Sequence, residues 1–354
     1  MVTPTQDTLL VIIHWTPPES WISAVSQALP NLRIICHQVS IWDTEVPDLP
    51  EEVWKSVTVL ATRKLYPTPE MVPNLRFVQV LSGGCNQIHG LPLYEKTDIT
   101  FATASGIHGP QMAEWVFSTY LSFQHHIPQY MEYQKENKWM DPESDEDTED
   151  AVGLRVGLLG YGSVGRQCAR VAKALGMDVY AYTYHDRSTS VSRKANTFTV
   201  PGTGDPNGEL PSKWYSAEKN ELNTFLASDL DLLVITAPIT KDTKGLIGRE
   251  QFDILSKKKP FLSNASRGKV INTDALLDAL HTGKIRGAAL DKTDPEPLPS
   301  DHELWNVKNV IITPHCGGCS TQYNERGLKI LKGNLERWMK REEVSNKVDR
   351  ALGY

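Results

Sequence analysis

The stretch Leu154–Gly176 reads LRVGLLGYGSVGRQCARVAKALG and decides the fold. Its first residues, among them Val156, Leu158 and Leu159, form an apolar run that predicts a strand buried on both faces. A glycine-rich turn follows, and beyond it apolar residues recur at helical spacing. Gly176 stands where a left-handed residue would end that helix. A strand, a glycine turn and a helix in this order indicate one βα unit of an open parallel sheet.

The turn itself, GYGSVG, has the glycine spacing of a diphosphate-binding loop. Gly160 permits a tight turn, Gly162 leaves room for a diphosphate beside the backbone, and Gly165 lets the helix pack closely on the strand. The first N–H groups of the helix, at Ser163 and Val164, have no partner inside the helix and can bind phosphate. The stretch therefore predicts a dinucleotide site.

The composition is that of an ordinary globular protein. The 354 residues, 40% hydrophobic and 23% charged, are enough for two domains. A formal net charge of -6 argues against nucleic acid as a partner. No apolar run approaches membrane-spanning length, no signal-peptide pattern opens the chain, and five scattered cysteines fit reduced thiols. We therefore expect a cytoplasmic protein that binds neither nucleic acid nor membrane.

Alternating strands and helices are expected on both sides of the glycine turn. Five apolar runs within residues 1–107 predict a small parallel α/β domain. A long helix is expected from about Gln111 to Lys138, followed by an acidic, solvated loop over residues 141–150. Residues 188–220 are too long for a simple connection and contain several glycines and prolines, which predicts an exposed insertion.

Polar residues follow several apolar runs in the second half of the chain. Arg267, Asp291 and His315 each stand just beyond such a run. The carboxyl ends of parallel strands share one edge with the glycine turn, so these residues are predicted neighbours across a cofactor. Glu296 lies in a proline-braced loop that would hold it near His315. The other residues of the predicted cofactor site are Thr183, Arg187, Ala237, Pro238, Thr243 and Ala265.

The side chains at this edge suit one kind of chemistry. Arg267 offers a planar fork of donors for a carboxylate and for an adjacent keto oxygen. His315 can give or take a proton near neutral pH, and a neighbouring Glu296 would favour its imidazolium form. A nicotinamide would supply the hydride. Together these groups predict reduction of a 2-oxo acid to a 2-hydroxy acid.

Two further motifs leave alternatives open. A strand of the first domain ends on Ser82-Gly83-Gly84, whose N–H groups could hold a carboxylate, although a plain turn would explain the same residues. Cys316 and Cys319 form a CxxC directly after the predicted acid/base histidine. Too few ligands gather there for a metal site, so we expect no metal and assign the thiols to loop packing.

Taken together, these motifs resemble those of the D-isomer-specific 2-hydroxyacid dehydrogenases along nearly the whole chain. The resemblance rests on GLLGYGSVG, on SNASRG at residues 263–268, on ALDKTDPEPLP at residues 289–299 and on TPHCGG at residues 313–318, in the family's order. It implies NAD or NADP as cofactor, a small 2-oxo or 2-hydroxy acid as substrate, and a homodimer.

The family's architecture sets expectations for fold and domains. The resemblance implies an α/β protein with a Rossmann dinucleotide-binding domain and a smaller, discontinuous, flavodoxin-like α/β substrate domain. Residues 108–319 would form the NAD(P)-binding domain, and residues 1–107 and 320–354 the substrate, or catalytic, domain.

The resemblance also implies roles for single residues. Arg267 would bind the substrate, Glu296 would assist, and His315 would be the acid/base. Asp291 would contact the nicotinamide amide. Ser82-Gly83-Gly84 would correspond to the family's loop for the substrate carboxylate, where Arg267 provides the other contact.

Cofactor choice is where the sequence departs most from the family. Thr183 stands where the family often has an acidic residue that holds the adenosine ribose. A threonine does not repel the extra phosphate of NADP, and Arg187 offers it a positive charge, so we predict NADPH. Asp186 could instead serve as the missing acid, which would favour NADH.

A second function from another class has the same fold. Corepressors that sense a dinucleotide share this architecture and even its catalytic residues. The sequence lacks long disordered, motif-bearing tails, which favours an enzyme.

Overall fold

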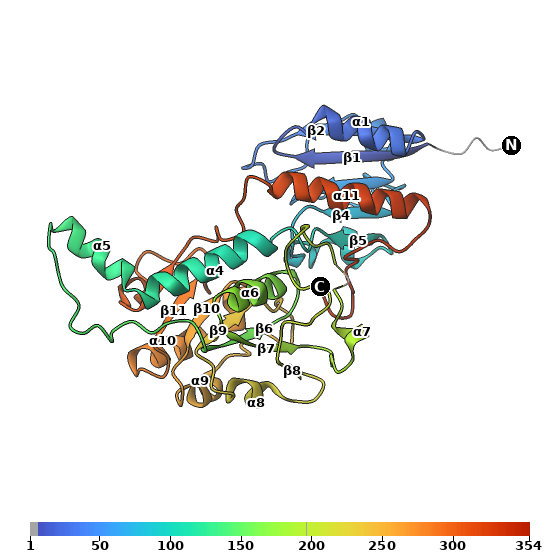
Figure 1. Ribbon diagram of the computed structural model, residues 1–354. Helices are drawn as coiled ribbons and strands as arrows, with labels where there is room; N and C mark the ends of the chain where they lie inside the picture. The colour runs from blue at the N-terminus through green and yellow to red at the C-terminus, as the bar shows by residue number, and fades with distance from the viewer. Residues whose placement is uncertain (1–5, 196) are drawn as a thin grey trace. The chain divides into compact units, whose positions relative to one another are not determined.

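The computed structural model describes residues 6–195 and 197–354, and the chain divides into two compact units (Figure 1). Unit 1 comprises Met1–Ile107, Asn196–Phe198 and Thr321–Tyr354, and unit 2 comprises His108–Ala195 and Thr199–Ser320. The C-terminal segment thus belongs to the unit that the first hundred residues build. Each unit is organised around one sheet whose strands are all parallel.

Unit 1 contains a five-stranded sheet in the order β2-β1-β3-β4-β5. This is the strand order of flavodoxin, which confirms the expected fold class for this half. All five strands predicted from the apolar runs are present. Their bounds are β1 Asp7–Ile13, β2 Leu32–Gln38, β3 Val59–Thr62, β4 Phe77–Val80 and β5 Thr100–Thr103.

Helices cover both faces of this sheet. On one face, α11 (Tyr323–Met339) buries Leu328, Leu331 and Leu335 against β1, and α1 (Glu19–Ala28) packs beside it. The apolar residues of α11 recur at helical spacing, so one face of the helix is buried. The other face is covered by α2 (Glu51–Ser56), the 3-10 helix Asn86–Ile88 and α3 (Pro92–Glu95).

Unit 2 contains a seven-stranded sheet in the order β12-β11-β10-β9-β6-β7-β8. Counted from β6, this is the doubly wound dinucleotide-binding order with one additional strand. The strands are β6 Arg155–Leu159, β7 Asp178–Thr183, β8 Lys213–Ser216, β9 Leu232–Ile235, β10 Phe261–Asn264, β11 Gly287–Leu290 and β12 Val310–Ile312.

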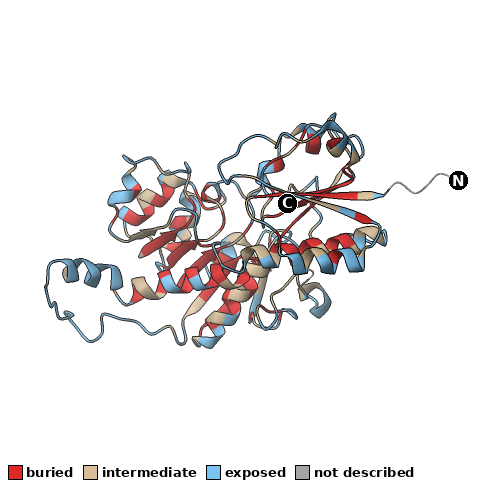
Figure 2. Cartoon of the chain, turned by 90° about the horizontal axis from the view of Figure 1, so that it is seen from above, coloured by how far each residue is buried: buried red, intermediate tan, exposed pale blue. Residues whose placement is uncertain are grey.

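Both faces of the second sheet are buried, as its apolar strands predict (Figure 2). Val156 and Leu158 of β6 pack on the face covered by α4 and α6, and Leu159 packs on the opposite face. The covering helices are α4 Gly109–Gln124, α6 Ser163–Ala174, α8 Leu222–Leu226, α9 Arg249–Leu255 and α10 Thr273–His281. Two 3-10 helices, Gly268–Val270 and Glu303–Asn306, lie in connecting loops.

The prediction of one helix from about Gln111 to Lys138 is wrong. The structure has two helices, α4, which ends at Gln124, and α5 (Ile127–Lys135). His126 between them has a φ of 54°, a left-handed conformation that breaks the helix. Pro128 follows in the first turn of α5, where its missing N–H costs nothing but prevents continuation from α4.

The prediction that residues 188–220 form an exposed insertion is also wrong. The segment contains α7 (Ser190–Arg193) and β8, which pairs with β7 and extends the sheet. Asp205 in its middle is only 5% exposed. Its carboxylate accepts the N–H groups of residues 208–210, so the loop satisfies its own polar backbone and can be buried. The acidic loop at residues 141–150 is exposed throughout, as predicted.

Candidate active site

The glycine turn has the shape that its residues predict. Gly160 has a φ of 107°, and a Cβ there would lie 2.7 Å from Thr236 Oγ1. A Cβ on Gly165 would lie 2.2 Å from the carbonyl oxygen of Gly160, so only glycine lets the helix approach the turn. A Cβ on Gly162 would meet no atom within 4 Å. The turn is therefore tight against the sheet but open beside Gly162.

Hydrogen bonds join the strand ends of unit 2 along the carboxyl edge of the sheet. The Thr236 hydroxyl, just beyond β9, donates to the carbonyl oxygen of Gly160 at 2.8 Å. The Ser266 hydroxyl, just beyond β10, donates to the carbonyl oxygen of Ala237. These bonds tie the Arg267 turn to the same edge as the glycine turn.

Arg267 is half-buried in this turn. The Asn264 amide donates to its carbonyl oxygen at 3.1 Å, and Nη1 of Arg267 donates to the carbonyl oxygen of Ser266 at 2.8 Å. A Cβ on Gly268 would lie 2.0 Å from the carbonyl oxygen of Thr293. The turn therefore packs directly against the loop that follows β11.

His315 and Glu296 form the pair that the sequence predicts. Nδ1 of His315 lies 2.5 Å from Oε1 of Glu296, and both side chains remain partly exposed, at 46% and 40%. His315 has a φ of 54°, and its N–H donates to the carbonyl oxygen of Asp291 at 2.9 Å. Its imidazole is thus held by a carboxylate on one side while still reachable from solvent.

Asp291 organises the loop that carries His315. Its Oδ1 accepts hydrogen bonds from the Thr313 hydroxyl at 2.7 Å and from the N–H groups of Cys316 and Gly317 at 2.8 and 2.9 Å. Its side chain is completely buried and its other oxygen pairs with a lysine. Both oxygens are engaged by the chain itself, so Asp291 holds the loop that carries His315. Its contact with the nicotinamide amide stays a prediction.

Lys292 is a member of the site that the sequence reasoning missed. Its side chain is only 4% exposed, and Nζ contacts the Asp291 carboxylate. Burial lowers the pKa of Lys292, Asp291 partly restores it, and the charges of Arg267 and Glu296 also act on it. Burial alone would raise the pKa of Asp291, but the hydrogen bond from Lys292 and its charge bring it below the ordinary value. A lysine inside the run ALDKTDPEPLP was the available signal.

The end of β7 is held by bonds within the chain. The Thr183 hydroxyl donates to the carbonyl oxygen of His185 at 2.7 Å. Asp186 pairs with Lys219 at 2.8 Å, which lowers the pKa of the Asp186 carboxyl. Nη1 of Arg187 donates to a backbone carbonyl within its own loop.

The remaining predicted cofactor residues lie on loops beyond β9 and β10. Ala237 is 8% exposed and Pro238 beside it is exposed. The Thr243 hydroxyl donates to the carbonyl oxygen of Pro238 at 2.6 Å, which closes this loop. Ala265 follows β10 directly and is half-buried. All four belong to unit 2.

Ser82, Gly83 and Gly84 lie in unit 1, just beyond β4. All three are half-buried, and the Ser82 hydroxyl donates to the Gly84 carbonyl at 2.7 Å, which closes the loop on itself. Gln87 also donates to the Ser82 hydroxyl at 2.8 Å.

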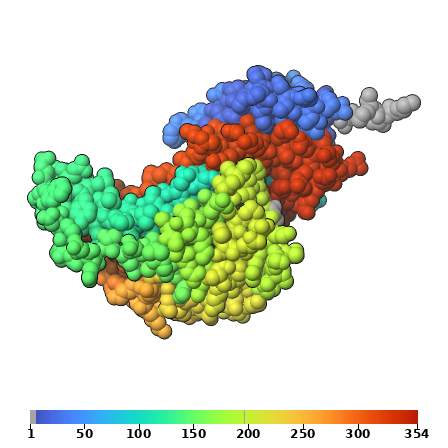
Figure 3. All heavy atoms as spheres, in the orientation of Figure 1, coloured from blue at the N-terminus to red at the C-terminus, as the bar shows by residue number. Residues whose placement is uncertain are grey.

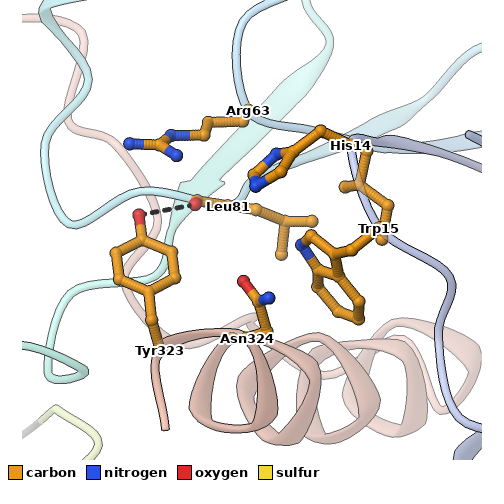
Figure 4. A pocket seen from close by; sticks show the side chains of 8 residues that line it. His14, Trp15, Arg63, Leu81, Tyr323 and Asn324 are labelled. Atoms are coloured by element: carbon orange, nitrogen blue, oxygen red, sulfur yellow. Dashed lines mark hydrogen bonds between the residues drawn. The ribbon is translucent and has the colours of Figure 1, made fainter. Parts of the chain in front are cut away.

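A small pocket of unit 1 was not predicted from the sequence. Figure 4 shows Tyr323 of α11 beside Arg63, with His14 across the pocket. The Tyr323 hydroxyl donates to the carbonyl oxygen of Leu81 at 3.1 Å, and Arg63 lies over the Tyr323 ring at 5.4 Å. Burial and the charges of Arg63 and Lys64 lower the pKa of His14. Leu81 immediately precedes the Ser82 loop, so the pocket adjoins that loop within unit 1.

Cys316 and Cys319 are both exposed. The N–H of Cys319 donates to the carbonyl oxygen of Cys316 at 2.9 Å, which closes a turn through two glycines. Their exposure does not support the expected packing role. Within residues 6–195 and 197–354, no three His, Cys, Asp or Glu side chains gather to hold a metal ion.

Comparison with known families decides what kind of protein this is. Residues 117–204 and 203–317, together more than half of the chain, match the NAD binding domain of the D-isomer specific 2-hydroxyacid dehydrogenases. The chain belongs to this family. The resemblance drawn from the motifs is thereby confirmed, and the matched residues cover the glycine turn, Arg267, Glu296 and His315.

Curated relatives and solved structures agree with the family. A hydroxypyruvate reductase from Blautia hydrogenotrophica is 29% identical over 290 residues, covering 78% of this chain and 79% of that protein. A glyoxylate reductase from Korarchaeum cryptofilum is 27% identical over 336 residues, covering 92% and 88%. A D-isomer specific 2-hydroxyacid dehydrogenase from Xanthobacter autotrophicus Py2, solved with NADPH and MES, has a TM-score of 0.76 at 25% identity, covering 99% and 100%.

The dehydrogenase is therefore an NAD(P)-dependent oxidoreductase. Its relatives are reductases of small acids, which does not favour a dinucleotide-sensing interaction protein. Among the residues that the structure describes, none belongs to a helix long and apolar enough to cross a membrane.

The buried pair of Asp291 and Lys292 yields a prediction about stability. Lys292→Met should lower the free energy of unfolding by about 3–5 kcal/mol, because it leaves a buried carboxylate without its partner. Adding Asp291→Asn should recover part of that loss, since the orphaned charge is gone. Urea unfolding of the single and double variants measures both effects.

Lys332→Met is the matched control, because Lys332 pairs with Glu336 at a partly exposed position on α11. Its loss should not exceed about 1 kcal/mol. Equal losses at Lys292 and Lys332 would contradict a special role for the buried pair.

Proposed function

We propose that the dehydrogenase reduces a small 2-oxo acid to a D-2-hydroxy acid, with NAD(P)H as hydride donor, His315 as proton donor and Arg267 binding the carboxylate and keto oxygen. The observation that carries the proposal is the contact of 2.5 Å between His315 and Glu296. It provides a positioned acid at the sheet edge that also holds the glycine turn.

The residues present fit a dinucleotide. The open space beside Gly162 leaves room for a diphosphate, and the N–H groups of Ser163 and Val164 begin α6 at that point. We assign Ala237, Pro238, Thr243 and Ala265 to the walls of the cofactor site because they follow the neighbouring strands β9 and β10. When bound, the nicotinamide supplies the hydride.

Arg267, His315 and Glu296 have different roles in the proposed reaction. Arg267 is suited to bind the substrate carboxylate through two parallel hydrogen bonds and to polarise the adjacent keto oxygen. His315 holds the proton that the developing alkoxide receives. Glu296 stabilises the imidazolium electrostatically and fixes the ring through Nδ1, leaving Nε2 for the substrate.

The substrate is proposed to be a small 2-oxo acid such as glyoxylate or hydroxypyruvate. Support comes from relatives named as reductases of these two acids, which match most of the chain. Unit 1 would be the substrate domain, and the role proposed for its Ser82-Gly83-Gly84 loop is to bind the substrate carboxylate.

A panel of 2-oxo acids with NADPH and NADH tests the proposed reaction. The protein should reduce at least one small 2-oxo acid, with chiral chromatography revealing the D product. Arg267→Lys should lower kcat/KM by about 10- to 100-fold, because lysine cannot form the two-pronged contact. Undiminished kcat/KM in this variant would remove Arg267 from the substrate site.

The pair of Glu296 and His315 predicts unequal losses of activity on substitution. His315→Gln should lower kcat by about 10²- to 10⁴-fold, because the proposed proton donor is gone. Glu296→Gln should lower kcat by a smaller factor, because a neutral amide can still accept the hydrogen bond from Nδ1 of His315 but carries no charge. Steady-state kinetics of both variants measures the two losses. A wild-type kcat in His315→Gln would remove His315 from the proposed role.

NADPH is the proposed cofactor. Asp186 is paired with Lys219 at 2.8 Å, which hinders it from acting as the acid that binds the adenosine ribose. Thr183 carries no charge that would repel a phosphate, and Arg187 follows in the same loop. The relative from Xanthobacter autotrophicus, solved with NADPH, supports this choice.

The preference is measured as kcat/KM with NADPH against NADH. NADPH should be the better donor, and Arg187→Ala should lower kcat/KM for NADPH by about 10- to 100-fold without altering that for NADH. Asp186→Ala is the control and should change neither. A preference for NADH that weakens in Asp186→Ala would overturn the assignment.

A homodimer is also proposed, formed through residues 127–152 of unit 2. Figure 3 shows that this segment projects from unit 2. None of the residues in α5 is buried. The large apolar residues exposed here are Ile127, Tyr130, Met131, Trp139, Met140 and Val152. Such a surface is typical of a contact with a second copy of the chain.

Sedimentation velocity tests this assembly. The wild type should sediment as a dimer, and Trp139→Asp should shift it toward the monomer, because Trp139 is 92% exposed and would lose its apolar contact. Trp42→Asp is the control, since Trp42 is 85% exposed in unit 1. A wild-type monomer would contradict the proposal.

A further inference from the structure

Residues 199–212, the docked segment, pack against α6 instead of extending into solvent. The side-chain oxygen of Gln167 accepts the N–H of Gly204 at 2.6 Å. Nη1 of Arg170 donates to the carbonyl oxygen of the same glycine at 3.2 Å. Both side chains come from the helix that begins at the glycine turn, so the docked segment is fixed to the cofactor-binding βα unit itself.

Asp205 is the centre of the docked segment. It is 5% exposed, and its Oδ1 accepts the N–H groups of Gly208 and Glu209 at 3.1 and 3.0 Å. Its Oδ2 accepts the N–H of Leu210 at 3.1 Å and the hydroxyl of Tyr161 at 2.7 Å. Three of these hydrogen bonds lie within the docked segment, and the fourth joins the segment to Tyr161 of the glycine turn.

Tyr161 is the residue between the first two glycines of that turn. Its ring is 6% exposed and lies edge-on to Trp214, with centroids 4.9 Å apart. Burial and the hydrogen bond to Asp205 raise the pKa of Tyr161, so the hydroxyl remains protonated and donates. A side chain of the proposed diphosphate-binding turn is thus anchored on a carboxylate 44 residues further along the chain.

Arg166 provides a second tie. It is 6% exposed, and its guanidinium donates to the carbonyl oxygens of Asp205 and Arg193. Nε of Arg193 in turn donates to the carbonyl oxygen of Arg187 at 2.7 Å. The same network therefore reaches the loop beyond β7, where the adenosine end of a dinucleotide lies in this fold.

We propose that Asp205 is a positioning residue for cofactor binding: through Tyr161 it holds the glycine turn, and through Arg166 it connects that turn to the Arg187 loop. This inference rests on the proposed placement of the cofactor over the glycine turn. It assigns a role to the segment that the sequence presented only as an insertion.

Docking of residues 199–212 and binding of the cofactor should favour each other. If the docked segment holds the turn in its binding shape, a bound dinucleotide must favour the docked state by the same factor. Loss of the Asp205 contact releases the turn and raises the dissociation constant of the cofactor. The chemical step at Arg267 and His315 is untouched once the cofactor is bound.

The experiment measures cofactor dissociation constants by fluorescence titration with NADPH and NADH. Asp205→Asn should raise them about tenfold and Tyr161→Phe about threefold, because each removes part of a buried charged hydrogen bond. The double variant should be no weaker than Asp205→Asn alone, since both changes break one contact. In Asp205→Asn, the kcat at saturating cofactor and the KM for the 2-oxo acid should stay at wild-type values.

Hydrogen exchange provides a second readout. NADPH should slow amide exchange in residues 199–212 of the wild type, and this protection should disappear in Tyr161→Phe, the variant least disruptive to folding. Thr203→Val is the control, because it removes a hydroxyl that donates to the carbonyl oxygen of Val200 within the same segment. It should leave the dissociation constants unchanged.

Wild-type dissociation constants in both Asp205→Asn and Tyr161→Phe would overturn the inference while leaving the proposed function intact. An equal rise in Thr203→Val would also overturn it, because the effect would then belong to the segment in general. If the wild type bound neither dinucleotide, the proposed function would fail and this inference with it.

Discussion

The hydrogen bonds to the buried carboxylate of Asp291 are the interactions on which the geometry of the candidate active site depends. Its Oδ1 gathers a hydroxyl and two N–H groups from the loop beyond β12, and its own carbonyl oxygen holds the N–H of His315. The carboxylate sits at the end of β11, a strand buried on both faces. The end of β11 therefore fixes the backbone of the loop that carries the imidazole, through the hydrogen bonds to Asp291.

Removing this carboxylate from water costs free energy, and a second buried charge, that of Lys292, offsets part of this cost. Lys292 neutralises Asp291 but is itself removed from water, which is why burial acts against the charged form of both groups. The attraction within such a pair is largely offset by the desolvation of its two charges. Replacing only one partner is the damaging change, because the survivor has no access to solvent.

Much of the site could be predicted because parallel strands place their carboxyl ends together. Arg267 and His315 follow β10 and β12, where that rule puts them, and Glu296 pairs with His315 from the loop after β11. The parallel pairing in both sheets follows from the alternation of strands and helices. Lys292 could not be placed, since the burial of a lysine depends on a partner whose own orientation is tertiary. Asp205 was missed because glycines and prolines indicate turns but do not say which carboxylate will shape them. The break at His126 was missed although Pro128, two residues later, signals the end of a helix.

The two outer strands of the seven-stranded sheet also bear on solubility. An unpaired strand edge invites pairing with another chain, and such pairing leads to aggregation. At one edge β12 is only three residues long. At the other, β8 begins with Lys213, whose ammonium lies 4.8 Å from the centre of the Tyr215 ring and 5.9 Å from that of Tyr180. The short β12 and the lysine on β8 thus oppose pairing of these edges with another chain, including during folding, when edge strands are transiently exposed.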